Sequence, residues 1–508
     1  MVLGAQPSIL WVWFYWNIIN GFSVSFFILF PFSFIFAVII LIFSSALISK
    51  FFLSIANFIH TPKEGIFKRD VKDKDYCYWS LRAVIKKWPF WLARQLSIPF
   101  IETVLLRLFG GKIGKNCALH EGWVDTEFVE IGNNVKLGQG SLILSSLIVQ
   151  DKLILKKTTI KNDVIISIHS VVFPGTNIKS NTILDALSTT NVDQEIDENS
   201  IYRGSPCKKI LRKTDFKNKN DLETLIFNNT DKKRFNKEIL REEAKELTVP
   251  FHLYISSGWI IIGFSFILPG FLFYLYIFGF LEPFLLSSLI TIESLFNFRT
   301  SIILLTLPVL FIGLYLLHLF FVALLTRIFY KFADKRGPKQ GVFDRNLDKE
   351  SKMLDYYHFR SFLFKYPIYV FIRSPFPWLI NWELRFLGSN KIGKDSVIEE
   401  SFLHSHVNLG KNCYLGTYTH ITNHLVDGVY GEENLTFFGA NLGKDSVFEA
   451  LTGTLPGTRV GQNSTFIPIG STVKFDELKG NAIYSKFPAS KLDKDEIQDR
   501  LGDEIINE

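Results

Sequence analysis

Two histidines in the C-terminal half of the chain have the spacing of a candidate site. His406 and His424 lie 18 residues apart, and His404 and His420 are close to them in the sequence. Imidazole can take up or release a proton near neutral pH, and in its neutral form it is also a common metal ligand. These residues therefore suit acid–base catalysis or metal binding, and the choice depends on how the fold places them.

The sequence around these histidines repeats every six residues. This period belongs neither to a helix nor to an ordinary strand, and it is typical of a parallel β-helix with three short strands per coil. One coil then takes about 18 residues, so His406 and His424 are expected to stack in adjacent coils about 4.8 Å apart. The lead residues of the repeat are Leu409, Leu415, Ile421, Leu442, Phe448, Thr454, Val460, Phe466 and Thr472.

The repeat is interrupted just after His424. A polar segment, residues 427–434, follows it, and the six-residue period returns at Leu442. A histidine at the root of a loop that leaves a regular solenoid is where a functional site is expected. The alternative is a solvated histidine beside a tolerated insertion.

An earlier array has the same period. Its lead residues run from Ile113 to Leu184, and it closes at residues 201–210. Residues 213–250 are charged and poor in apolar residues, which predicts a helical linker.

Two apolar blocks precede the two arrays. No Asp, Glu, Lys or Arg occurs before Lys50, and residues 9–58 are apolar apart from a break between Asn20 and Pro31. The second block contains two uncharged stretches, residues 253–281 and 301–326. Stretches of this length can cross a hydrocarbon core of about 30 Å. We therefore expect a pair of transmembrane helices in residues 1–59 and another in residues 251–330.

Each pair is followed by a basic and aromatic connector, residues 60–110 and 331–388. Arg82, Lys86 and Lys87 are spaced among apolar residues between Tyr76 and Phe109. This pattern predicts amphipathic helices on the membrane surface. The alternative is a helical hairpin that packs on the β-helix.

The two halves of the chain are related in sequence. Residues 63–69 match residues 339–345 at an offset of 276, and Arg82 and Arg107 match Arg360 and Arg385 at an offset of 278. Internal repeats of this kind indicate a tandem duplication. The predicted fold class is a mixed membrane protein of two units, each with a transmembrane pair, amphipathic helices and a parallel β-helix, residues 111–212 and 389–495.

The distribution of basic residues predicts the topology. Lys and Arg are concentrated in residues 63–74, 232–245 and 327–339, whereas the short connections on the opposite side contain only Arg299. By the positive-inside rule both β-helices should lie on the cytoplasmic face of a multi-pass protein. The net charge of +7 is then better explained by anionic lipid than by nucleic acid.

The arrays resemble the left-handed β-helix acyltransferase superfamily, and Gly204-Ser205-Pro206 is similar to the closing motif of many such domains. The duplicated unit more specifically resembles the membrane-bound, tandem acyltransferase-like C-terminal region of ε-poly-lysine synthetase-type proteins, which are non-ribosomal peptide synthetase-like. The resemblance covers nearly the whole chain from about residue 60. It implies left-handed β-helices and the transfer of an acyl or aminoacyl group from a thioester to an amine or a hydroxyl.

The resemblance places the catalytic histidine at His424, as a general base. Its counterpart in the first array, at an offset of 278, is Ser146. A serine cannot act as a base near neutral pH, so the first β-helix is expected to be a degenerate, silent site. A carboxylate or a carbonyl should orient the other ring nitrogen of His424. The expected supporting or substrate-binding residues are His406, His420, Asn423, Asp427, Glu432 and Glu433.

The sequence contains no adenylation or carrier segment, so we expect the donor to arrive in trans, as acyl-CoA or as the thioester of a separate carrier protein. No bound cofactor or metal is expected. The expected partners are membrane lipids, that carrier protein and a second copy of the chain, with no nucleic acid. Two alternatives stay open. One is a metal site like that of γ-class carbonic anhydrases on His404, His406, His420 and His424, and the other is a non-catalytic membrane scaffold.

Overall fold

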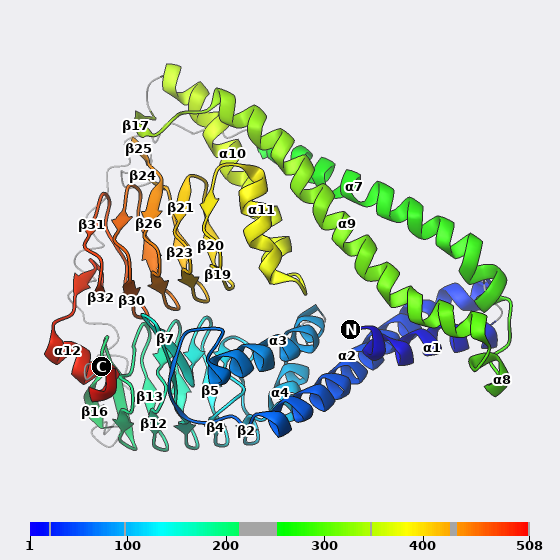
Figure 1. Ribbon diagram of the computed structural model, residues 1–508, viewed down its shortest axis with the longest axis horizontal. Helices are drawn as coiled ribbons and strands as arrows, with labels where there is room; N and C mark the ends of the chain where they lie inside the picture. The colour runs from blue at the N-terminus through cyan, green and yellow to red at the C-terminus, as the bar shows by residue number, and fades with distance from the viewer. Residues whose placement is uncertain (20–21, 96–97, 213–250, 346–347, 427–433, 506–508) are drawn as a thin grey trace, which may run out of the picture.

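A computed structural model describes residues 1–508 except 20–21, 96–97, 213–250, 346–347, 427–433 and 506–508. The predicted linker, residues 213–250, therefore lies outside the described residues. Figure 1 shows two stacks of short strands, one above the other, and long helices that extend from them and converge at the opposite end of the molecule.

The lower stack, which we name the first solenoid, consists of three sheets. Their strands are parallel except for the closing pair β15–β16, so each coil contributes one strand to each sheet. The first sheet contains β2 (Lys112–Ile113), β4 (Val129–Ile131), β9 (Thr158–Ile160), β12 (Asn177–Ile178) and β14 (Glu195–Ile196). The second contains β5 (Lys136–Leu137), β10 (Ile165–Ile166), β13 (Ile183–Leu184), β15 (Ser200–Arg203) and β16 (Lys208–Arg212), and the third contains β3 (Trp123–Val124), β6 (Leu142–Ile143) and β11 (Val171–Val172).

The upper stack, the second solenoid, has the same arrangement. Its first sheet contains β18 (Lys391–Ile392), β21 (Val407–Leu409), β26 (Ala440–Leu442), β29 (Arg459–Val460) and β31 (Glu477–Leu478). The second contains β19 (Val397–Ile398), β22 (Tyr414–Leu415), β27 (Val447–Phe448), β30 (Ser464–Phe466), β32 (Ala482–Ser485) and β33 (Ser490–Lys491), and the third contains β20 (Phe402–Leu403), β23 (His420–Ile421) and β28 (Gly453–Thr454). The lead residues point inward, and Leu415, Ile421, Phe448 and Phe466 are fully buried.

Glycines that follow lead residues are explained by the close spacing of the coils. A Cβ atom on Gly410 would lie 2.4 Å from the backbone nitrogen of Lys444, and one on Gly443 would lie 2.5 Å from that of Gln462. Side-chain carbons essentially never come closer than 3.0 Å to such an atom. These positions therefore require glycine because the next coil leaves no room for a side chain.

Replacement of Gly443 by alanine is expected to destabilise the second solenoid by about 1–3 kcal/mol, because the backbone of the next coil must move. Thermal unfolding followed by circular dichroism should show a lower midpoint. Gly263→Ala is the matched control, because a Cβ atom there has nothing within 4 Å. Equal midpoints for the two variants would contradict the proposed spacing.

A three-stranded antiparallel sheet stands beside each solenoid. In the first, β7 (Ser146–Val149) and β8 (Lys152–Leu155) form a hairpin that leaves the coil, and β1 (Gly65–Lys68) pairs with β8. In the second, β24 (His424–Val426) and β25 (Asn434–Phe437) form the hairpin, and β17 (Gly341–Asp344) pairs with β25. The matching sequences at residues 63–69 and 339–345 thus contain the outer strands of these sheets.

The helices of the apolar blocks differ in length from the prediction. The structure has three helices long and apolar enough to cross a membrane among the residues described: α2 (Val24–Ile59), α7 (Phe251–Tyr276) continued by the π-helix η2 (Ile277–Leu286), and α9 (Phe298–Arg336). Helix α1 (Val2–Ile18) has 17 residues, about 26 Å. Pro31 lies inside α2 and not at the break. The short α8 (Ile292–Leu295) lies between η2 and α9.

The connector helices are α3 (Lys74–Gln95) and α4 (Pro99–Leu108) in the first half, and α10 (Asp348–Ile372), η3 (Pro377–Leu379) and α11 (Ile380–Leu387) in the second. Arg82 is 1% exposed, and Lys86 is also buried. Both bind Glu127 of the first solenoid, at 2.9 and 3.0 Å. These cations therefore face the solenoid and not a membrane surface, because an acidic partner is available there.

The two solenoids pack against each other directly. One apolar cluster contains Leu142 and Phe173 of the first solenoid together with Ala450 and Ile467 of the second. The backbone amide of Ile148 donates to Glu449 Oε1 at 2.7 Å across this interface. The C-terminal helix α12 (Lys494–Leu501), followed by η4 (Asp503–Ile505), contributes Leu501 to the same cluster.

Candidate functional site

His424 is the first residue of β24, at the point where the hairpin leaves the second solenoid. Its Nδ1 atom lies 3.1 Å from Asn423 Oδ1. Asn423 is 1% exposed, and its Nδ2 donates to the carbonyl and hydroxyl oxygens of Ser405 at 2.7 and 2.9 Å. Because these bonds fix the amide oxygen toward the ring, Nδ1 carries the proton, and Nε2 keeps its lone pair.

Aromatic side chains surround the imidazole. The ring of His404 lies 4.6 Å from that of His424 between centroids, and the ring of Tyr357 on α10 lies 5.6 Å away. Burial lowers the pKa of His424 from its usual 6.5 to about 4, and the positive charge of Lys365 acts in the same direction. The side chain is therefore neutral at physiological pH, which is the form that can accept a proton.

The neighbour of His424 is His404, so the expected stacking on His406 is wrong. The residue that stacks on His406 in the next coil is Gly439, whose added Cβ would meet the His406 carbonyl oxygen. The hairpin leaves the coil before that corner, so β21 pairs with β26 across the interruption. His406 instead contacts the ring of Phe437 at 5.4 Å, and its Nε2 lies 3.8 Å from Asp334 Oδ1.

The other predicted supporting residues are dispersed. His420 is exposed on β23, with its ring 5.8 Å from that of Phe402. Asp427, Glu432 and Glu433 lie outside the described residues. The orienting role expected of a carboxylate or a carbonyl is filled by the carbonyl oxygen of the Asn423 side chain. In the sequence, this contact was indicated by the position of Asn423 directly before His424.

The metal alternative requires at least three ligands around one point. Within the described part of the chain, no group of three or more His, Cys, Asp or Glu side chains is placed to hold a metal ion. His404 and His424 form a close pair, whereas His406 and His420 are directed elsewhere.

Ser146 occupies the equivalent position in the first solenoid, as the first residue of β7. Its hydroxyl donates to Asp125 Oδ2 at 2.8 Å, and the same oxygen accepts from the backbone amides of Ser145 and Ser146. Asp125 follows β3 as His404 follows β20. The first solenoid thus has a serine–aspartate pair where the second has two histidines.

Sequence reasoning missed the residues that α10 brings to the site. Tyr357, His358 and Lys365 lie about 60 residues before His424, and no repeat relates them to it. Burial lowers the pKa of His358 to about 4, with Arg345 and His424 contributing through their charges. The site is therefore a group of imidazoles that are covered by a helix.

These neutral histidines should make stability depend on pH. An unfolded histidine binds a proton below about pH 6.5, whereas folded His358 and His424 do so only near pH 4. Between these values the unfolded state binds more protons, so stability falls as the pH is lowered through this window and is retained above it. The denaturation midpoint should fall less steeply with acid in His358→Gln and His424→Gln. His120→Gln, at an exposed histidine of the first solenoid, should follow the wild type.

Comparison with solved structures finds hexapeptide-repeat acetyltransferases. A hexapeptide-repeat-containing acetyltransferase from Vibrio cholerae is 19% identical, with a TM-score of 0.22 over 26% of this chain and 92% of that one. A maltose O-acetyltransferase from Clostridium difficile is 18% identical, with a TM-score of 0.21 over 26% and 88%. A galactoside acetyltransferase in complex with coenzyme A is 19% identical, with a TM-score of 0.22 over 26% and 79%.

No protein-family model matches the chain, and the search of curated proteins found no match. Similarity at this level does not carry a functional assignment to this chain. The arrangement around His424 is therefore the observation from which a function must be argued.

Proposed function

We propose that this protein is a membrane-bound acyltransferase. It moves an acyl or aminoacyl group from a thioester to an amine or hydroxyl acceptor, with His424 as the general base. The observation that carries this proposal is the hydrogen bond between His424 Nδ1 and Asn423 Oδ1, at 3.1 Å. It fixes the tautomer in which Nε2 is the basic atom.

In the proposed reaction, the acceptor nitrogen or oxygen attacks the thioester carbonyl carbon while Nε2 takes its proton. The tetrahedral intermediate then collapses, the carbon–sulfur bond breaks, and the leaving thiolate recovers the proton from Nε2. Proton transfer by a positioned side chain contributes about 10²- to 10⁴-fold to such a step. The donor is acyl-CoA or a carrier-protein thioester, supplied in trans.

The first solenoid is proposed to be catalytically silent. Ser146 takes the place of the His424 base, and its hydroxyl donates to Asp125, which already accepts hydrogen bonds from two backbone amides. These hydrogen bonds occupy the carboxylate oxygen that faces Ser146. The first solenoid then serves as a packing partner for the second.

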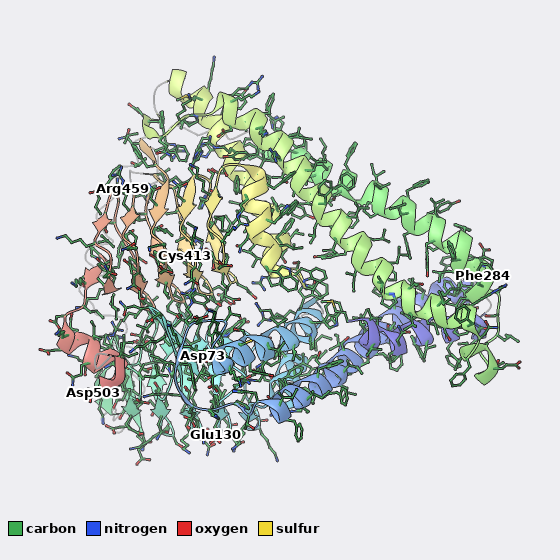
Figure 2. All side chains as sticks on the ribbon, viewed as in Figure 1. Asp73, Glu130, Phe284, Cys413, Arg459 and Asp503 are labelled. Carbon is green, nitrogen blue, oxygen red and sulfur yellow. The ribbon has the colours of Figure 1, made fainter. Side chains whose placement is uncertain are left out.

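The proposed membrane placement is supported by the three long apolar helices among the described residues. The basic residues that flank them favour cytoplasmic solenoids, and this assignment is part of the proposal. Cysteine labelling of exposed positions such as Arg459 and Phe284 in sealed vesicles would test it, because the two side chains lie at opposite ends of the molecule (Figure 2).

The deciding experiment measures acyl transfer from a panel of thioesters to amines and alcohols by purified protein, with metal analysis of the same samples. We expect transfer by the wild type and by His120→Ala, loss of transfer in His424→Ala, and no stoichiometric metal. Tightly bound zinc that disappears with His424, without transfer, would favour the metal site. Absence of both signals would favour a scaffold.

A further inference from the structure

A cavity of about 610 Å³ lies between the two solenoids, at the corner where the first solenoid has Ser146. Helix α3 and the residues after β3 line it from the first half of the chain, and Glu399, Tyr414 and Glu449 line it from the second. Figure 2 shows side chains from both stacks filling the space where they meet, next to α3. The volume is that of a site for a small organic molecule.

The cavity has an excess of acidic side chains. Six carboxylates line it, against four cations. Each cation is already paired, with partners at 3.0–3.3 Å: Lys86 with Glu127, Lys87 with Glu399, Arg94 with Glu102 and Glu400, and Arg373 with Glu400. Among the described residues, Asp125 and Glu449 have no cation within 4.0 Å. These two are therefore the acidic side chains of the lining that have no cation partner.

Glu449 is 5% exposed and faces the cavity. Its Oε1 accepts from the backbone amide of Ile148 at 2.7 Å, but a buried carboxylate without a cation is costly. Burial raises the pKa of Glu449 to about 8, against the lowering effect of Arg69, while Asp125 raises it further. A positively charged group that entered the cavity would restore the ionised form.

A second cavity, of about 440 Å³, lies among the membrane helices. Its lining from α1, α2, η2 and α9 is almost entirely apolar. Trp88 of α3 lines this cavity, and Trp91, one turn further on, lines the first. The two indoles stack with centroids 5.2 Å apart, and Tyr315 of α9 lies 6.4 Å from Trp91. These aromatic side chains therefore connect the lining of the acidic cavity with that of the apolar one.

We propose that the two cavities form one binding site for an amphiphilic primary amine, with its ammonium group between Asp125 and Glu449 and its alkyl tail past Trp91 among the membrane helices. The charge of the first cavity selects a cation, and the apolar second cavity selects a chain. A fatty alcohol or a fatty carboxylate lacks the matching ammonium group. The site is separate from His424 and does not depend on catalysis there.

The test uses the full chain in phosphatidylcholine nanodiscs and measures the uptake of radiolabelled dodecylamine by equilibrium dialysis, relative to empty nanodiscs. Dodecylamine is expected to bind at least about tenfold more tightly than dodecanol or dodecanoate, and also more tightly than butylamine. Equal binding of the three dodecyl compounds would reduce the site to a lipid-tail groove and overturn the proposal. Binding of butylamine as tight as that of dodecylamine would overturn the role of the second cavity.

Variants test each half of the site. Glu449→Gln, which keeps an oxygen for the Ile148 amide, and Asp125→Asn should each weaken dodecylamine binding about tenfold. Glu477→Gln, an exposed carboxylate on β31, is the control. Ile312→Trp, which fills the second cavity, should reduce dodecylamine binding to that of butylamine, whereas Ile267→Trp on an exposed helix face should not. Wild-type binding by folded Glu449→Gln would refute the proposal.

The His424→Ala variant separates this site from the proposed function. It should bind dodecylamine like the wild type even though acyl transfer is lost. Dodecylamine binding lost together with activity in this variant would contradict a separate site.

Discussion

Replacement of His424 by alanine is expected to lower kcat for acyl transfer by about 10²- to 10⁴-fold, with a much smaller change in KM, because the base acts on the proton that moves in the transition state. The first solenoid has Ser146 in place of a base, so no second site should sustain a residual rate. His120→Ala removes an exposed imidazole of the first solenoid and should retain wild-type kcat. Half of the activity remaining in His424→Ala would show that both solenoids catalyse.

The pH profile gives a readout that loss of structure would not mimic. Because burial and Lys365 lower the pKa of His424 to about 4, kcat/KM should fall only as the pH drops toward 4. Asn423→Asp places a carboxylate against Nδ1, and this charge should raise the pKa of His424 and move the acidic limb to higher pH. If the acidic limb of the kcat/KM profile lies at the same pH in Asn423→Asp as in the wild type, another group controls the rate.

The six-residue period predicted much of what the structure shows around His424. The period depends on local geometry, since each lead residue must turn inward and each coil must stack on the last. Leu415, Ile421 and Phe448 are buried accordingly. The interruption after His424 also marked the root of β24 correctly.

The error over His406 shows where a repeat stops being informative. The predicted stacking assumed that His424 still belonged to the coil, but the hairpin already begins at His424, and Asn408 of the coil lies beside Asn441, which is 33 residues later. The extra residues form the hairpin, and Gly439 takes the place expected for His424. A periodic argument holds only between residues that the same uninterrupted coil connects.

The six-residue repeat could not predict contacts between segments that are far apart in the sequence. Tyr357 reaches His424 because β17 joins the hairpin beside α10, and no local spacing encodes that approach. Composition was also ambiguous for Arg82 and Lys86, since cations among apolar residues fit a membrane surface as well as a buried ion pair. The acidic Glu127 of the first solenoid, which binds both cations, decided between the two interpretations.

The buried ion pair of α3 gives the second large expected effect. Arg82→Met should lower the apparent free energy of unfolding in urea by about 3 kcal/mol, because removing one partner of a buried pair leaves the other poorly compensated. Arg82 is 1% exposed and donates to Glu127 at 2.9 Å, and Lys86 then remains as the only cation on that carboxylate. Intrinsic tryptophan fluorescence can follow the transition, since Trp79 and Trp88 lie on the same helix.

A double-mutant cycle distinguishes a buried pair from a surface contact. Glu127→Gln combined with Arg82→Met should cost more than Arg82→Met alone, because Lys86 then stays buried without its carboxylate partner. The matched control is Lys112→Met, whose partner Glu130 lies 2.6 Å away on an exposed face, and its effect should stay within about 1 kcal/mol. If Arg82→Met cost no more than Lys112→Met, α3 would not be anchored to the first solenoid through Arg82. The cations of α3 would then be free to face lipid. Trp88 and Trp91 of α3 would no longer be held in a fixed position between the apolar and acidic cavities.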